Sequence, residues 1–201
     1  MAEEIHSIKD TRVVAARALA ASAGRDSARK CLLEGEEILG WALAAGVSVE
    51  HVFFHAKLEH SPILAALGAA GIPCLAVSDG ILKKISGTHY LIPVIGVGDI
   101  APVLRAEAPL EDFVIVLDDV RDFGNLGTIV RTARAFAVRD LVTTAPDVDF
   151  WYRKVIESSR GKVFDVRIHR FPSAEAAIGE LHRQGFQVIS STRTSPATPS
   201  G

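Results

Sequence analysis

Residues 114–136 read VIVLDDVRDFGNLGTIVRTARAF, and they carry strand, loop and helix signals in immediate succession. The apolar run at 113–117 predicts a buried strand, and the acidic, glycine-containing loop after it predicts a change of direction. A helix is predicted from about Leu126 to Val138, with Asn125 as its N-cap, because asparagine accepts hydrogen bonds from the first turn. Ligands of open α/β sheets bind beyond the carboxyl ends of strands, so this loop is the first candidate for a functional site.

The predicted helix has two faces of different character. Its apolar residues recur at helical spacing and are expected to be buried; they are Leu126, Ile129, Val130, Ala133 and Ala137. Gly127, Arg131 and Arg134 are expected together on another face. Because the N-terminus of a helix favours anions, Asn125 and Arg131 are predicted close to a phosphate.

Strands and helices alternate on both sides of this segment. On the N-terminal side, helices are predicted at 10–24, 35–45, after Ser61-Pro62 and at 79–85, with a short apolar piece at 31–33 and strands at 49–56, 74–78 and 91–98. On the C-terminal side, strands at 140–144, 163–168 and 186–190 alternate with helices at 150–159 and 173–184. This alternation predicts an α/β protein. The near-continuous apolar strands of the second half predict a parallel sheet covered on both faces.

The segment 99–112 lacks a period of either 2 or 3.6 and carries Pro102 and Pro109, so it is predicted to link two domains. The domains are predicted to be an N-terminal α/β domain over residues 1–107 and a parallel-sheet domain over residues 108–201. The last eleven residues are polar and proline-containing, which is typical of an unstructured tail.

Composition excludes several classes of protein. With 48% apolar and 23% charged residues, the 201-residue chain is predicted to fold as a soluble globule. Its apolar runs are shorter than the roughly 20 residues that cross a membrane. The acidic N-terminus does not resemble a secretory signal, so a cytoplasmic location is expected. Cys31 and Cys74 have no metal-binding spacing, and no metal is predicted.

The charge of the chain is unevenly distributed. The net charge is −2, but residues 121–170 contain ten Lys/Arg against six Asp/Glu, which makes this window +4 and the remainder −6. A locally basic face on an acidic protein fits either an RNA or phosphate site or a solvated helix face without a partner.

The quoted segment resembles the first motif of the SpoU/TrmH family of SPOUT RNA methyltransferases, D-x-x-D-P-G-N-x-G-x-x-x-R-T-A. The matching residues are Asp119, Asp122, Gly124, Asn125, Gly127, Arg131, Thr132 and Ala133. Three further segments resemble the family: KVIESSRGKVF at 154–164, CLLEGEEIL at 31–39, which resembles the opening of its N-terminal RNA-binding domain, and ISGTHYLIPVIGV at 85–97. Departures occur where the family usually has proline, glycine, arginine and a Gln-Gly pair; they are Phe123, Ala137, Glu157 and Leu91-Ile92.

The resemblance implies an S-adenosylmethionine-dependent methyltransferase that acts on a ribose 2′-hydroxyl of rRNA or tRNA. Asn125 and Arg131 match catalytic positions, and a guanidinium, which is hardly ever neutral, is expected to stabilise a developing alkoxide rather than to take a proton. The side chains predicted to bind RNA are Arg29, Arg121, Arg134, Arg153, Lys154 and Arg160. Trp151 and Tyr152 either stack on RNA bases or, as the commoner case, are half-buried aromatics at a helix start.

The family's second and third motifs, which form the knot that holds S-adenosylmethionine and much of a homodimer interface, have no match in this sequence. The second domain is therefore expected to be an incomplete SPOUT-type parallel α/β domain, with no assignable cofactor-binding residues. Two functions remain open: a methyltransferase whose cofactor site is completed by further chain or a second chain, and a catalytically inactive RNA-binding protein.

Overall fold

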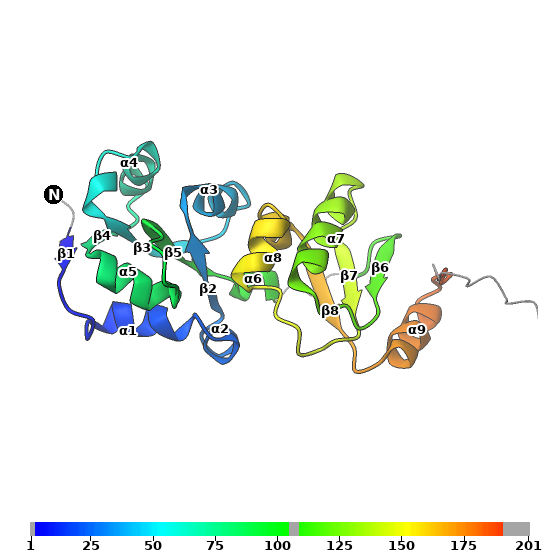
Figure 1. Cartoon of the computed structure of the whole chain (residues 1–201). Coiled ribbons are helices and arrows are strands. Elements are labelled where there is room, and N and C mark those ends of the chain that lie inside the picture. Colours follow the sequence, from blue (N-terminus) through cyan, green and yellow to red (C-terminus); the bar gives the residue numbers. More distant parts are fainter. Residues whose placement is uncertain (1–2, 105–108, 191–201) are drawn as a thin grey trace, which may run out of the picture.

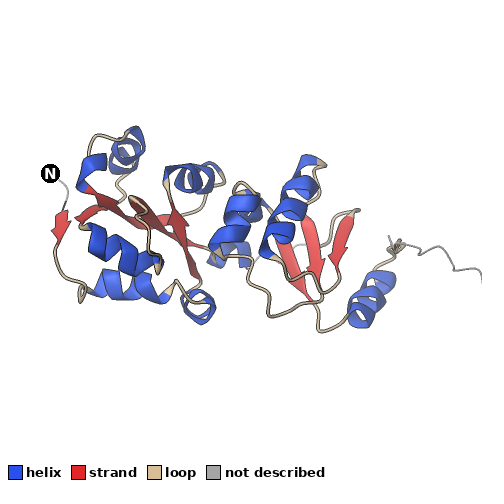
Figure 2. Ribbon diagram, in the orientation of Figure 1, coloured by secondary structure: helices blue, strands red, loops and turns tan. Residues whose placement is uncertain are grey.

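A computed structural model describes residues 3–104 and 109–190, and it contains two β-sheets with helices packed against them (Figures 1 and 2). This arrangement confirms the α/β class predicted from the alternation of strands and helices. No helix in the described ranges is long and apolar enough to cross a membrane. The predicted tail at 191–201 lies outside the described residues.

The N-terminal sheet is mixed and has the strand order β1-β4-β3-β5-β2. Its strands are β1 (Glu3–Ile5), β2 (Lys30–Glu34), β3 (Val49–His55), β4 (Cys74–Val77) and β5 (Val94–Asp99). β4 pairs in parallel with β1 and β3, whereas β5 pairs antiparallel with β3 and β2. β1 was not predicted, because three residues are too few to display a period of 2.

Helices cover both faces of this sheet. Apolar residues of α1 (Thr11–Ala18) and α5 (Asp79–Ser86) form one buried cluster with the strands. Those of α3 (Glu36–Ala44) and α4 (Pro62–Ala69) belong to a second cluster on the other face. The 3₁₀ helix η1 (Ala56–Leu58) connects β3 to α4.

The single helix predicted at 10–24 is wrong, because the chain breaks into α1 and α2 (Ser22–Ala28). Asp10 caps α1 by accepting the N–H of Arg12 at 2.9 Å. Gly24 does not end a helix but lies within α2, where a side chain would collide with the carbonyl of Ala18. Glycine is needed here because α2 folds back onto the end of α1, a tertiary constraint that a helical period does not reveal.

The C-terminal sheet is parallel, with the order β6-β7-β8. Its elements are β6 (Val114–Leu117), α7 (Phe123–Ala135), β7 (Asp140–Thr143), α8 (Arg153–Ser158), η2 (Lys162–Asp165), β8 (Arg167–Arg170) and α9 (Ala174–Arg183). The central strand β7 is buried along its length, whereas β6 and β8 are mostly half-buried. The prediction of a sheet covered on both faces therefore holds for the central strand only.

Three predicted elements of the second half differ from the structure. Residues 163–168 were predicted to be one strand, but Val163 and Phe164 are buried through η2 and the strand begins at Arg167. An apolar run cannot distinguish these conformations, because both bury its side chains. Residues 186–190 form no strand and pair with no other strand among the described residues, and Ile189 is 85% exposed. Part of the predicted linker is helical, as α6 (Ala101–Leu104).

The two sheets are joined by a continuous buried contact, and α8 lies between them (Figure 1). At this contact Gly161 has a φ of +72°, and a Cβ built on it would lie 2.5 Å from Cβ of Trp41 in α3. A buried ion pair also crosses it. Nε of Arg25 in α2 donates to Oδ2 of Asp149 at 2.9 Å, and the two side chains are 7% and 8% exposed. Because a buried charge is costly without its partner, this pair constrains how the two halves meet.

Candidate functional site

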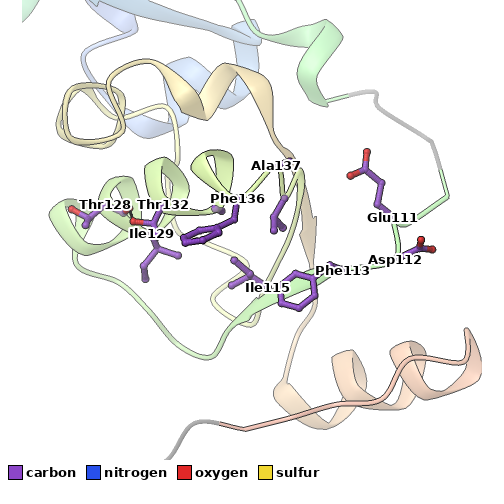
Figure 3. Close-up of a pocket in the computed structure, with 11 residues that line it drawn as sticks. Glu111, Asp112, Phe113, Ile115, Thr128, Ile129, Thr132, Phe136 and Ala137 are labelled. Atoms are coloured by element: carbon purple, nitrogen blue, oxygen red, sulfur yellow. Dashed lines mark hydrogen bonds between the residues drawn. The ribbon is translucent and has the colours of Figure 1, made fainter.

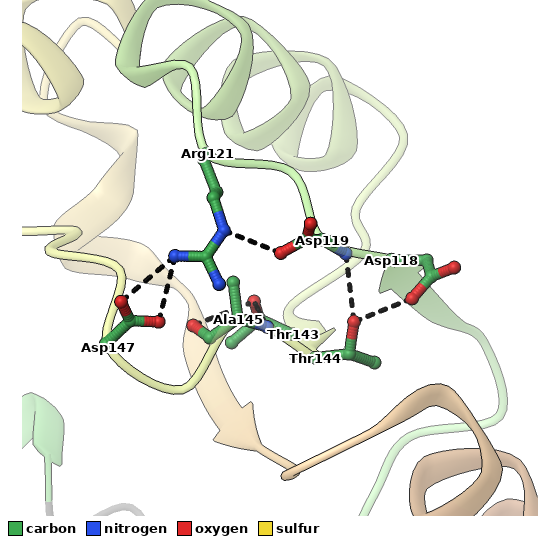
Figure 4. Close-up of polar contacts among 7 residues, drawn as sticks. All are labelled: Asp118, Asp119, Arg121, Thr143, Thr144, Ala145 and Asp147. Atoms are coloured by element: carbon green, nitrogen blue, oxygen red, sulfur yellow. Dashed lines mark hydrogen bonds and ion pairs between the residues drawn. The ribbon is translucent and has the colours of Figure 1, made fainter.

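The loop that follows β6 is held in place by the end of the neighbouring strand β7 (Figure 4). Thr144 Oγ accepts the N–H of Asp119 at 2.9 Å and donates to Oδ1 of Asp118 at 2.7 Å. Asp119 has a φ of +48°, a left-handed conformation that aspartate tolerates better than most residues. The loop at the carboxyl end of the parallel sheet, where a ligand was expected, is thus pre-shaped by hydrogen bonds.

Arg121 lies in this loop, and two carboxylates neutralise its charge. Its Nε donates to Asp119 Oδ1 at 2.6 Å, and its Nη1 donates to both oxygens of Asp147 at 3.0 and 3.1 Å (Figure 4). These bonds lower the pKa of the Asp147 carboxyl. Arg121 remains 54% exposed, but an RNA phosphate would have to compete with both carboxylates for it.

Asp122, not Asn125, caps α7. Its Oδ1 accepts the N–H of Asn125 at 2.8 Å, so the helix begins at Phe123, three residues earlier than predicted. Aspartate and asparagine are equally good caps, and the sequence could not choose between two candidates three residues apart. Asn125 consequently lies in the first turn with its side chain exposed.

Arg131 is exposed on α7 and has no carboxylate partner within residues 3–104 and 109–190. Six residues separate it from Asn125, which places the two side chains about 9 Å apart along the axis and about 120° apart around it. The helix alone therefore does not bring the two predicted catalytic side chains together.

Gly127 lies on the buried face of α7 and not on the face of the arginines, contrary to prediction. A Cβ built on it would lie 2.7 Å from the carbonyl oxygen of Val155 and 2.8 Å from the backbone nitrogen of Ser159. Glycine allows α8 to approach the backbone of α7 at this point. Ala137, predicted to be buried, is instead exposed with a φ of +62°, because α7 ends at Ala135.

This close approach brings together two of the segments that the sequence singled out. Ser158 Oγ donates to the carbonyl oxygen of Phe123 at 3.3 Å, and the rings of Phe123 and Tyr152 lie 4.8 Å apart. Lys154 extends toward the first turn of α7, with its Cε 3.5 Å from a Cβ built on Gly124. An exposed lysine of α8 thus lies beside the helix N-terminus, where the helix dipole favours an anion.

The other predicted RNA-binding residues lie in different surroundings. Arg29 ends α2 in a left-handed conformation and is exposed, as is Arg160 in the turn after α8. Arg134 is half-buried, and its Nε is buried without a hydrogen-bond partner among the described residues. Arg153 donates to Glu34 Oε2 at 3.2 Å and also to the hydroxyl of Tyr90.

The structure corrects the charge count made on residues 121–170. Arg121, Arg153, Lys162 and Arg167 each form an ion pair with a carboxylate. Three of those partners, Glu34, Glu111 and Asp119, lie outside the window, so the count could not include them. The basic surface available to RNA is therefore smaller than the sequence indicated, and it includes Arg131, Lys154 and Arg160.

Sequence reasoning missed a carboxylate between the two halves. Glu34 ends β2 inside the quoted LLEG run, and its side chain is only 5% exposed. Burial raises the pKa of the Glu34 carboxyl, and the neighbouring Arg153 opposes this effect. Arg153 lies 119 residues away along the chain, so no local pattern predicted the pair.

An apolar hollow with a volume of about 910 Å³ lies beside α7. Ile129 of α7, Phe136 just after that helix, Ile115 of β6 and Phe113 just before that strand point into it (Figure 3). Phe113 and Phe136 are 66% and 78% exposed. Glu111 and Asp112 are its charged lining residues, so it does not suit an RNA phosphate.

Comparison with known proteins bears on both halves of the chain. Residues 112–200 match the model of the SpoU rRNA Methylase family, and residues 10–91 match that of the MRM3-like substrate binding domain. A Synechocystis protein described as an uncharacterized tRNA/rRNA methyltransferase is 33% identical over 94% of this chain.

The chain belongs to the SpoU family of RNA 2′-O-methyltransferases.

The relatives are longer than this chain. It covers 71% of the Synechocystis protein and 36% of mouse mitochondrial rRNA methyltransferase 3, to which it is 31% identical. A crystal structure of an AdoMet-bound rRNA methyltransferase from Sinorhizobium meliloti is 25% identical, with a TM-score of 0.68, and 68% of that chain is covered. This SpoU family chain thus has an N-terminal domain of the MRM3-like type and a C-terminal parallel sheet of the methyltransferase type.

Proposed function

We propose that this SpoU family chain binds rRNA or tRNA and positions a ribose 2′-hydroxyl for methylation. The observation that carries the proposal is the contact between α7 and α8. Exposed Lys154 of α8 lies beside the N-terminus of α7, and exposed Arg131 lies further along α7. Cationic side chains at a helix N-terminus are suited to hold the phosphate next to the reacting ribose.

S-adenosylmethionine would supply the methyl group of this reaction as an electrophile. In that transfer the 2′-oxygen would bond to the methyl carbon as the methyl–sulfur bond breaks, and the 2′-hydroxyl proton would pass to solvent water. Arg131 would grip the adjacent phosphate and stabilise the negative charge that develops on the oxygen. Asn125 would help to order the loop between β6 and α7.

RNA binding is expected to weaken steeply with salt. Each neutralised phosphate lowers the slope of log K against log salt by about 0.7 to 0.9. A filter-binding titration of a structured rRNA fragment between 50 and 200 mM salt measures this slope. Lys154→Gln should make the slope shallower by roughly the contribution of one phosphate contact. Arg183→Gln on α9, where Arg183 is 75% exposed and paired with Glu180, is the matched control and should leave the slope unchanged. No binding at 50 mM salt, or binding that does not weaken between 50 and 200 mM salt, would contradict the proposal.

We further propose that residues 1–201 bind S-adenosylmethionine negligibly. The apolar lining of the hollow beside α7 supports this, since it offers few partners for the cofactor's polar groups. Isothermal titration should detect no stoichiometric site of micromolar affinity. A site of that affinity would overturn this part of the proposal. Binding of RNA without methyl transfer in any form of the protein would instead favour the catalytically inactive RNA-binding protein.

The remaining sequence predictions stand as proposals. They are the domain boundary between residues 107 and 108, a homodimer for a form that contains the cofactor site, and a cytoplasmic location. The family supports the first two by resemblance. The location depends on the organism, because relatives include mitochondrial proteins of the mouse and human.

A further inference from the structure

A polar cleft of about 350 Å³ lies between the two halves of the chain. The N-terminal half contributes Glu34 at the end of β2, Ser86 at the end of α5, and Gly87 and Thr88 directly after that helix. The C-terminal half contributes Trp151, Tyr152 and Arg153 from the start of α8. Since both halves form its walls, the cleft depends on their packing against each other.

The Glu34 carboxylate is the most unusual group in this cleft. Its side chain is 95% buried, yet within the described parts of the chain it accepts a hydrogen bond from Arg153 alone, at Oε2. Its Oε1 has no hydrogen-bond partner in those parts, and Glu34 is one of the residues that line the cleft. A carboxylate only accepts hydrogen bonds, so the ligand of the cleft must present N–H or O–H donors.

Planar side chains also line the cleft. Tyr152 is half-buried, and the guanidinium of Arg25 lies 5.6 Å from the centre of its ring. Aromatic rings and guanidinium planes are the surfaces on which proteins stack unpaired RNA bases. The buried carboxylate meanwhile disfavours a phosphate in the same space.

The cleft adjoins the proposed methylation site. The ring of Tyr152 lines the cleft and also contacts Phe123, the first residue of α7. A base seated beside Tyr152 would therefore belong to a nucleotide close to the one held at the N-terminus of α7.

We propose that this cleft binds an unpaired guanine of the RNA substrate, whose adjacent N1–H and N2–H groups donate to the Glu34 carboxylate. Guanine presents two adjacent donor groups on its Watson–Crick edge, whereas adenine, uracil and cytosine each present only one there. Glu34 is thus a specificity-determining residue. The inference rests on the proposed function, because it assumes an RNA substrate.

Fluorescence anisotropy of labelled RNA heptamers tests this assignment with the full 201-residue chain. The heptamers are seven uridines and the same sequence with a central guanosine, inosine, adenosine or cytidine. The guanosine heptamer is expected to bind at least about tenfold more tightly than the uridine and adenosine heptamers, as for one good bidentate contact to a base. Inosine should be intermediate, because it lacks the N2 amino group.

Three variants separate base recognition from charge. Glu34→Gln should abolish the preference for guanosine, and Glu34→Asp should reduce it without changing the charge. Glu37→Gln makes the same charge change at an exposed position outside the cleft and should leave the preference intact. Thermal unfolding identifies any variant that does not fold, and a misfolded Glu34→Gln leaves Glu34→Asp as the deciding variant.

The failure of this inference differs from the failure of the proposed function. Equal binding of all five heptamers, or an unchanged guanosine preference in a folded Glu34 variant, overturns the guanine site while salt-dependent binding of the structured rRNA fragment still stands. Loss of binding to the rRNA fragment overturns the proposed function itself.

Discussion

Replacement of Gly127 by alanine is expected to destabilise the protein by about 2 to 3 kcal/mol, the upper range for overpacking a well-packed core. The added methyl group would lie 2.7 Å and 2.8 Å from backbone atoms of Val155 and Ser159, and a backbone cannot rotate away as a side chain can. α8 must therefore shift, which loosens the packing of the segment 154–164 against the motif in α7. Thermal unfolding followed by circular dichroism measures the effect, and a fall of several degrees in Tm is expected.

Gly179→Ala in α9 is the matched control, because Gly179 lies in a helix and a Cβ built there has nothing within 4 Å. It should be neutral or stabilising, by up to about 1 kcal/mol, since alanine has the higher helix propensity. Adding Ser158→Ala to Gly127→Ala removes Ser158 Oγ, with which the new methyl group would collide, and should restore little stability because the backbone contacts remain. Full restoration would mean that Ser158, and not the α8 backbone, requires the glycine.

Arg131→Ala is expected to lower single-turnover methyl transfer by about a hundredfold or more, in a form of the protein that binds S-adenosylmethionine. Loss of one positioned donor to a developing negative charge typically has this size. RNA affinity should change much less. Arg131→Lys should recover little, because an ammonium group cannot reproduce the two-pronged contact of a guanidinium with phosphate. Rapid-quench assays with radiolabelled cofactor measure the transfer step.

The control for this prediction is Arg139→Ala and not Arg134→Ala, because Arg134 is half-buried and its loss would also disturb packing. Arg139 is exposed just beyond the C-terminal end of α7, so its removal changes the net charge equally at the far end of the helix. It should leave methyl transfer nearly unchanged. Equal effects of the two variants on RNA binding, with an unchanged transfer step in both, would make Arg131 a docking residue.

Local patterns were sufficient for most elements of the fold. Predicted strands and helices such as β3, α3 and β7 are confirmed, because the side chains of these segments carry the period of the element. The motif from Asp119 to Ala133 also led to the family, since its exposed polar residues have a spacing that packing alone does not require. Predictions are wrong where two local conformations are nearly equal in energy. The start of α7 is an example, because Asp122 and Asn125 are alternative N-caps.

The candidate site itself depended on contacts between residues distant in the chain. Arg121 and Arg153 count equally as basic residues in the sequence, but Asp119 and Asp147 neutralise the first and Glu34 pairs with the second. The sequence shows which charged side chains exist. Whether an arginine is free to bind RNA depends on whether the fold places a carboxylate within about 4 Å of it, where the Coulomb energy becomes large. Gly127 also shows what the sequence determines and what only the tertiary structure decides. The sequence contains a glycine in a helical segment, but only the packing of α8 against α7 explains why no side chain fits there.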